Sequence, residues 1–235
     1  MTRKLLLWCG VLASLLYAAM LVFIPMQWPA YSSTSQAVSE LSAIDAPTRS
    51  VWVAWGAVYA LLVVAFGWGV WLSAAKMRSL RVAGGSLVGW GIFGFFWPPM
   101  HLRGAEFTLT DTLHIIWSVI IVLGMLFTIG CGAAAFGKYF KRYSAGTILA
   151  FVVFGLLTFA DAPKLAAGLP TPWLGVWERI NILAYMLWVV VFAILLLRPH
   201  HFVTLIPRSA RLDGARELHD FAAPQHAHAD AVPSP

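Results

Sequence analysis

The chain has 235 residues, of which 60% are hydrophobic and only 11% are charged. Soluble proteins carry roughly a quarter charged residues, so this composition argues against a water-soluble protein and makes lipid the expected solvent. The formal net charge of +6 comes from Lys and Arg in short runs between apolar segments. That distribution is typical of membrane topology, so we expect the lipid bilayer as a partner and no nucleic acid.

Six segments are long and apolar enough to cross about 30 Å of hydrocarbon, which takes roughly 20 residues. The sequence therefore predicts an all-α fold, a polytopic integral membrane bundle of six transmembrane helices within residues 1–198. The first segment is predicted to be a retained helix, because its apolar run is long and no cleavage pattern follows it. The spans are expected near residues 5–24, 51–75, 82–97, 112–136, 145–160 and 178–197.

Lys and Arg are divided unequally between the two ends of these segments. Twelve fall on the side of the two termini, and four fall on the other: Arg49, Arg103, Lys164 and Arg179. The positive-inside rule thus predicts a cytoplasmic (plasma) membrane protein with both termini in the cytoplasm. Residues 199–235 are rich in Ala, Pro and His and lack apolar periodicity, so they are predicted to form a disordered cytoplasmic tail.

The first outer loop is predicted to contain a short amphipathic helix on the outer surface. Ser33 and Gln36 fit the S-x-x-Q capping box that starts a helix. Ala37 and Leu41 then share one face by their spacing. Glu40 lies on another face and is expected either to meet water or to turn inward over the bundle.

The opening of the fourth segment places two ionisable residues on one helical face. Asp111 and His114 are three residues apart, and His114 lies about one turn inside the membrane boundary. A histidine at that depth needs a partner, so the pair is a candidate for acid–base chemistry or for holding a metal. Asp111 also suits the positive end of a helix dipole without any catalytic role. Two ligands are too few for a specific metal site, and no cofactor is implied.

The ends of the fifth and sixth segments add further polar residues on the same side. Asp161, at a helix C-terminus, calls for a cation such as Lys164 or Arg179. Arg179 is expected to reach the interface or to pair with Asp161 or Asp111. We expect one outer cluster that binds a ligand or staples the helix ends, formed by Ser39, Glu40, Asp111, His114, Asp161, Glu178, Arg179 and Asn181. His101 and Arg103 are further candidates, although nothing in the sequence fixes their position.

The third segment is dense in glycine, and Gly85 and Gly89 form a G-x-x-x-G pair. Small residues let helix backbones approach closely in lipid. The pair predicts close packing of this segment within the bundle. The alternative is a homo-oligomer that packs through Gly85 and Gly89.

Three segments of the chain resemble a bacterial membrane family known as domain of unknown function 998. Residues 31–43 resemble its outer-loop signature S-x-x-I-S-E-L-G, with Ser42 where the family usually has glycine. Residues 110–114 and 175–181 resemble the openings of its fourth and sixth helices. The likeness covers about residues 5–198 and implies a compact six-helix membrane bundle. It implies no activity, substrate or catalytic residue.

Three functions are compatible with these features. A ligand-binding, sensing or accessory membrane protein ranks first, because this function requires the fewest specific sequence features. An intramembrane hydrolase acting on lipid or an envelope precursor would use Asp111, His114 and Glu178 as catalytic candidates, because carboxylates near an apolar core can act as general acids. A small-solute transporter ranks last, because the inner half of every predicted span lacks a charged residue.

Overall fold

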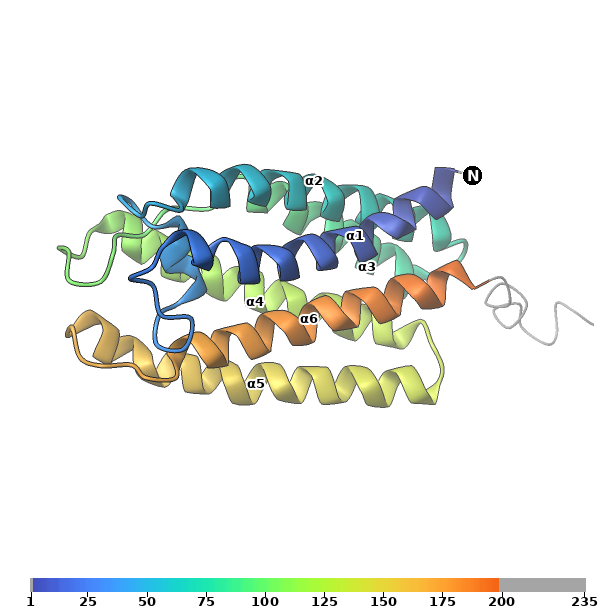
Figure 1. Ribbon diagram of the computed structural model, residues 1–235. Coiled ribbons are helices and arrows are strands. Elements are labelled where there is room, and N and C mark those ends of the chain that lie inside the picture. Colours follow the sequence, from blue (N-terminus) through green and yellow to red (C-terminus); the bar gives the residue numbers. More distant parts are fainter. Residues whose placement is uncertain (1, 199–235) are drawn as a thin grey trace, which may run out of the picture. The chain divides into compact units, whose positions relative to one another are not determined.

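The computed structural model describes residues 2–198, which form six long helices (Figure 1). Five of them, all except α3, are long and apolar enough to cross a membrane. The tail predicted over residues 199–235 lies outside the described residues. The helices are α1 (Thr2–Phe23), α2 (Arg49–Ser73), α3 (Arg78–Gly94), α4 (Leu109–Ala134), α5 (Lys138–Ala166) and α6 (Leu174–Leu197).

The helices run up and down, and each packs against its neighbours in sequence. Further packing of α1 on α6 closes the arrangement into a ring. The loops that follow α1, α3 and α5 all meet at one end of the bundle. There the Ile44 N–H donates to the Met100 carbonyl at 2.7 Å, and the Thr171 hydroxyl donates to the Ser35 carbonyl at 3.0 Å. We call these three loops, residues 24–48, 95–108 and 167–173, the cap.

The α3 helix crosses the bundle even though it is the shortest. Its 17 residues rise about 26 Å at 1.5 Å per residue. It begins next to the end of α2, and the loop that follows it joins the cap. Its two ends therefore lie at opposite ends of the bundle.

The largest difference from the predicted bounds is at α5, which runs from Lys138 to Ala166 instead of over residues 145–160. Its first two turns carry Lys138, Lys141 and Arg142. A helix needs no apolar residues where it leaves the hydrocarbon, so a search for apolar runs detects only its middle. Near its other end the helix includes Pro163.

Close packing of α3 depends on glycines next to the predicted pair. A Cβ at Gly84 would lie 2.6 Å from the Trp71 backbone nitrogen, and one at Gly91 would lie 2.9 Å from that of Val64. Gly85 instead faces the Trp71 side chain, and Gly89 has no heavy atom of the described chain within 4 Å. A homo-oligomer through Gly85 and Gly89 stays a prediction.

The core lies towards the end of the bundle opposite the cap, where Trp188, Phe66 and Phe192 are fully buried. Phe192 lies 4.8 Å from the Trp188 ring and 6.1 Å from the Phe66 ring, measured between centroids. The indole Nε1 of Trp188 donates to the Ser144 hydroxyl at 2.9 Å, a buried bond that joins α6 to α5. A polar group in an apolar core thus has its partner.

Ser144→Ala is expected to lower the free energy of unfolding in lipid bicelles by about 0.6 kcal/mol, with about 1.7 kcal/mol as the upper limit. The change leaves the buried Trp188 N–H without an acceptor. Ser118→Ala is the matched control, because its hydroxyl bonds only to the His114 carbonyl of its own helix. Equal stability of the two variants would show that the interhelical bond contributes nothing.

Candidate functional site

The first cap loop folds differently from the prediction. Its regular elements are two short 3-10 helices, η1 (Pro25–Gln27) and η2 (Val38–Ser42), and not an amphipathic α-helix. The Gln36 side chain accepts the Ser32 N–H at 2.7 Å, one residue before the predicted Ser33. The predicted capping box is therefore wrong, because the contact closes a turn and no helix starts there.

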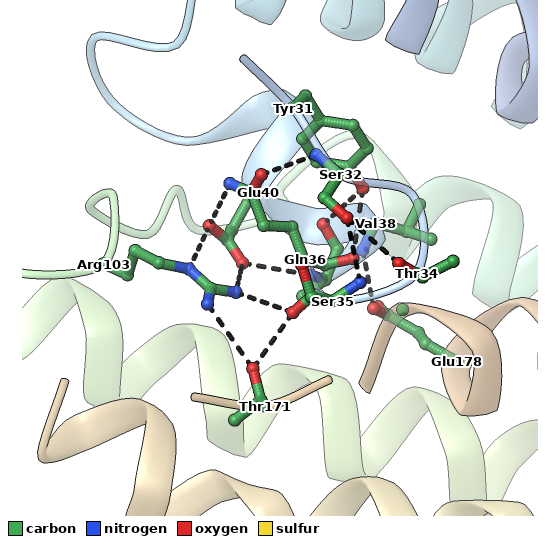
Figure 2. Close-up of polar contacts among 12 residues, drawn as sticks. Tyr31, Ser32, Thr34, Ser35, Gln36, Val38, Glu40, Arg103, Thr171 and Glu178 are labelled. Carbon is green, nitrogen blue, oxygen red and sulfur yellow. Dashed lines mark hydrogen bonds and ion pairs between the residues drawn. The ribbon is translucent and has the colours of Figure 1, made fainter. Parts of the chain in front are cut away.

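Glu40 is fully buried within the cap and faces inward. Its Oε1 accepts the Ala37 N–H at 2.9 Å and Arg103 Nη2 at 2.6 Å. Its Oε2 accepts Arg103 Nε at 3.0 Å and Gln36 Nε2 at 3.0 Å (Figure 2). This bidentate guanidinium–carboxylate geometry is the strong form of an ion pair. The bond to Glu40 also raises the pKa of Arg103 above its usual value, so the guanidinium stays charged.

Arg103 joins the three cap loops to one another. Beyond Glu40, its Nη2 donates to the Ser35 carbonyl at 3.1 Å, and its Nη1 lies 3.4 Å from the Thr171 hydroxyl. Thr171 is itself buried and donates to the same Ser35 carbonyl (Figure 2). One guanidinium from the second loop therefore binds the first loop and reaches the third.

Side chains at the start of α6 bind the main chain of the first cap loop. Glu178 Oε2 accepts the Val38 N–H at 2.6 Å. Arg179 Nη1 donates to the Ser33 carbonyl at 2.7 Å, and its Nη2 donates to the Tyr31 hydroxyl at 3.0 Å. Burial raises the pKa of Tyr31 to about 12, so this phenol is neutral at physiological pH. These contacts fix the main chain of the loop over α6.

Two of the predicted cluster members, Asp161 and Asn181, form no hydrogen bond with the cap loops. Asp161 pairs with Lys164 Nζ at 2.7 Å within α5. The predicted pairing of Arg179 with Asp161 or Asp111 is therefore wrong, because Arg179 binds main-chain oxygens and Tyr31 instead. Asn181 lies near Gly155 of α5, and its Oδ1 is buried without a hydrogen-bond partner among residues 2–198.

Ser39 contributes to the network only through its main chain. Its carbonyl accepts the Ser42 hydroxyl at 2.9 Å, a contact that closes η2. Its N–H points to Glu178, beside that of Val38. Two successive backbone donors of η2 thus face the same carboxylate from α6.

Asp111 forms a second network at the start of α4. Its Oδ1 accepts the His101 N–H at 2.7 Å, and its Oδ2 lies 2.9 Å from His101 Nδ1. The same Oδ2 accepts the N–H and the hydroxyl of Thr108, both at 2.9 Å. Asp111 thus caps α4 and fastens the loop over residues 95–108, which also carries Arg103.

His114 contacts that loop and not Asp111. Its Nδ1 lies 2.8 Å from the Pro98 carbonyl oxygen and 3.1 Å from Trp97 Nε1. A protonated Nδ1 donates to Pro98, and a bare Nδ1 accepts from Trp97, so the tautomer selects one of the two bonds. In either case the buried imidazole holds the residues that follow α3.

Asp111→Ala is expected to lower the free energy of unfolding by about 1–3 kcal/mol, because it leaves the partly buried donors of His101 and Thr108 without an acceptor. Deuterium uptake by the amides of residues 100–108 should rise with it. Glu106→Ala in the same loop is the control, since Glu106 is exposed. If Asp111→Ala matched this control in both measurements, Asp111 would not hold the loop over residues 95–108 in place.

Sequence reasoning missed several residues that build the cap. Arg103 and His101 could not be placed, and Tyr31, Thr171 and Gly175 were not singled out as polar or packing residues. The main signal available was Arg103 itself, one of few cations on its side of the chain. Within residues 2–198, no three His, Cys, Asp or Glu side chains are grouped closely enough to hold a metal ion.

The helices and the cap define a class of protein. An all-helical fold with five helices able to cross a membrane is a multi-pass membrane protein. A family model described as a protein of unknown function (DUF998) matches residues 11–195. The chain belongs to this family, which confirms the resemblance seen in its sequence. No curated protein and no solved structure matches it.

Proposed function

We propose that the protein is a ligand-binding, sensing or accessory membrane protein whose cap is a fixed recognition surface. The observation that carries this proposal is the state of Glu40. Both of its oxygens already accept hydrogen bonds from within the cap. A general base or a metal ligand needs a lone pair turned towards its target. Because both oxygens of Glu40 already accept hydrogen bonds, this carboxylate supports a structural role in the cap and not a catalytic one.

The same proposal includes six membrane crossings with the cap outside the cell. The short connection between α2 and α3, and the place of the loop after α3 in the cap, support α3 as the sixth span, although it is short for the hydrocarbon. A helix of this length is accommodated by local thinning or by flanking side chains. The twelve basic residues at the other side support cytoplasmic termini. A reporter fused after residue 137 should therefore be cytoplasmic, and activity of that reporter outside the cell would contradict this orientation.

An intramembrane hydrolase is the second candidate, and one observation favours it. Asp111 orients the His101 imidazole through Nδ1, and the His101 side chain is 27% exposed. A carboxylate that orients an imidazole in this way is the arrangement of a general base. Against it, no Ser or Cys side chain within residues 2–198 is hydrogen-bonded to that imidazole. The earlier catalytic candidates Asp111, His114 and Glu178 also belong to separate networks.

Photo-cross-linking in living cells separates the two candidates. A photoreactive side chain at Ser33, which is exposed on the cap, is expected to give a discrete adduct. The same group at Leu156, which is 65% exposed on α5, should give only lipid adducts. Absence of an adduct at the cap, together with lipid hydrolysis by the purified protein that His101→Ala abolishes, would overturn the proposal in favour of the hydrolase.

A further inference from the structure

A small cavity lies between four helices, near the middle of the bundle. Its volume is about 10 Å³, close to the roughly 10–15 Å³ that a cavity needs to hold one water molecule. Its lining includes three hydroxyl-bearing residues, Ser14 of α1, Tyr59 of α2 and Tyr185 of α6. The rest of the lining is apolar and includes Phe66 and Leu87.

The hydroxyl groups around this cavity are incompletely bonded. Ser14 is 3% exposed and donates to the Gly10 carbonyl at 2.9 Å, so its oxygen can still accept. Tyr185 is 4% exposed. Within residues 2–198, the hydroxyls of Tyr59 and Tyr185 have no hydrogen-bond partner. A hydroxyl buried in an apolar environment without a partner costs about 1–3 kcal/mol by protein mutational data.

We propose that the cavity is a binding site for one water molecule. The water accepts the hydroxyl protons of Tyr59 and Tyr185 and donates to Ser14 Oγ. Three partners are the usual number for a buried water. The volume excludes any larger ligand, and no carboxylate lines the cavity to hold a cation. This inference is independent of the proposed function of the cap.

One water in this place would connect helices that are distant in sequence. Ser14, Tyr59 and Tyr185 come from α1, α2 and α6, which enclose the same space. A bridging water is nearly as favourable in enthalpy as a direct hydrogen bond. The three hydroxyl groups that line this cavity then all have partners.

Water-edited solid-state NMR on the full chain in lipid bilayers tests this site directly. Polarisation transferred from water should reach the ring of Tyr185 and Cβ of Ser14. The indole of Trp117 in the apolar helix α4 is the internal control, because its Nε1 is buried without a partner and does not line the cavity. Transfer to Tyr185 no greater than to Trp117 would overturn the proposal.

A double-mutant cycle with Tyr59→Phe and Tyr185→Phe supplies the second measurement. Loss of either hydroxyl is expected to release the water, so the double variant should be less destabilised than the sum of the single variants. The transferred NMR signal at Ser14 should be lost in both single variants, which distinguishes a water from a direct bond between the tyrosines. Additive effects, or a signal that persists in both variants, would show that the hydroxyls of Tyr59 and Tyr185 do not hold a water molecule in this cavity.

Discussion

Glu40→Ala is expected to lower the free energy of unfolding by about 3 kcal/mol, the low end of the cost of breaking a buried ion pair and the largest effect of any single substitution in the cap. The carboxylate is fully buried, whereas the Arg103 side chain is 30% exposed, so water partly compensates the guanidinium charge that remains. Here the lost carboxylate also leaves the Ala37 N–H and the Gln36 amide without their acceptor. The measurement is reversible unfolding of the purified protein in mixed micelles.

The control for this prediction is Glu106→Ala, which removes an exposed carboxylate from the cap and should change stability by no more than about 0.5 kcal/mol. A cycle with Arg103→Ala then isolates the pair. Once Glu40 is absent, Arg103→Ala should cost much less than it does in the wild type. Equal costs of Arg103→Ala in the two backgrounds would contradict the ion pair described in the cap.

Gly175→Ala is expected to displace the first cap loop from α6. A Cβ at this position would collide with the carbonyl oxygens of Gln36 and Ser33. The Gly175 N–H donates to the Thr34 carbonyl at 2.9 Å, and displacement of the loop would break this bond. Overpacking costs about 1–3 kcal/mol, and backbone oxygens cannot rotate away as a flexible side chain can. We expect a net loss of about 2 kcal/mol or more.

The matched control is Gly146→Ala on α5, where a Cβ would meet no heavy atom of the described chain within 4 Å. Alanine is the better helix former by about 1 kcal/mol, so this variant should be neutral or more stable. The two glycine substitutions are therefore predicted to act in opposite directions. Gly175→Ala with wild-type stability would show that the loop does not lie against α6 as described.

Helix positions follow largely from local composition. The helices could be recognised as apolar segments because crossing hydrocarbon sets a minimum length and excludes charge. Five of them are long and apolar enough to do so. The ends were harder to place, as α5 shows, because its charged first turns are helical outside the apolar region. The Asp161–Lys164 pair was also accessible, because residues three apart share a helix face.

Partners in the cap could not be predicted in the same way. Glu40 and Arg103 are 63 residues apart, and no spacing rule connects two loops across a bundle. The periodicity of the sequence did not decide whether Glu40 faces water or the interior. Its ion pair with Arg103 decides this. The S-x-x-Q pattern predicted a helix start, but the Gln36 side chain bonds equally well one residue earlier. Asp111 and His114 share a face as predicted, yet each binds a different part of the neighbouring loop.

Hydrogen exchange at the amides of Ala37 and Val38 tests the braced cap most directly. Each amide donates to a carboxylate, Ala37 to Glu40 and Val38 to Glu178. In the full chain in lipid nanodiscs, both amides should exchange far more slowly than those of an unstructured loop, and Glu40→Ala should remove the protection at Ala37. Exchange of both amides in the wild type at the rate of an unstructured loop would contradict the account.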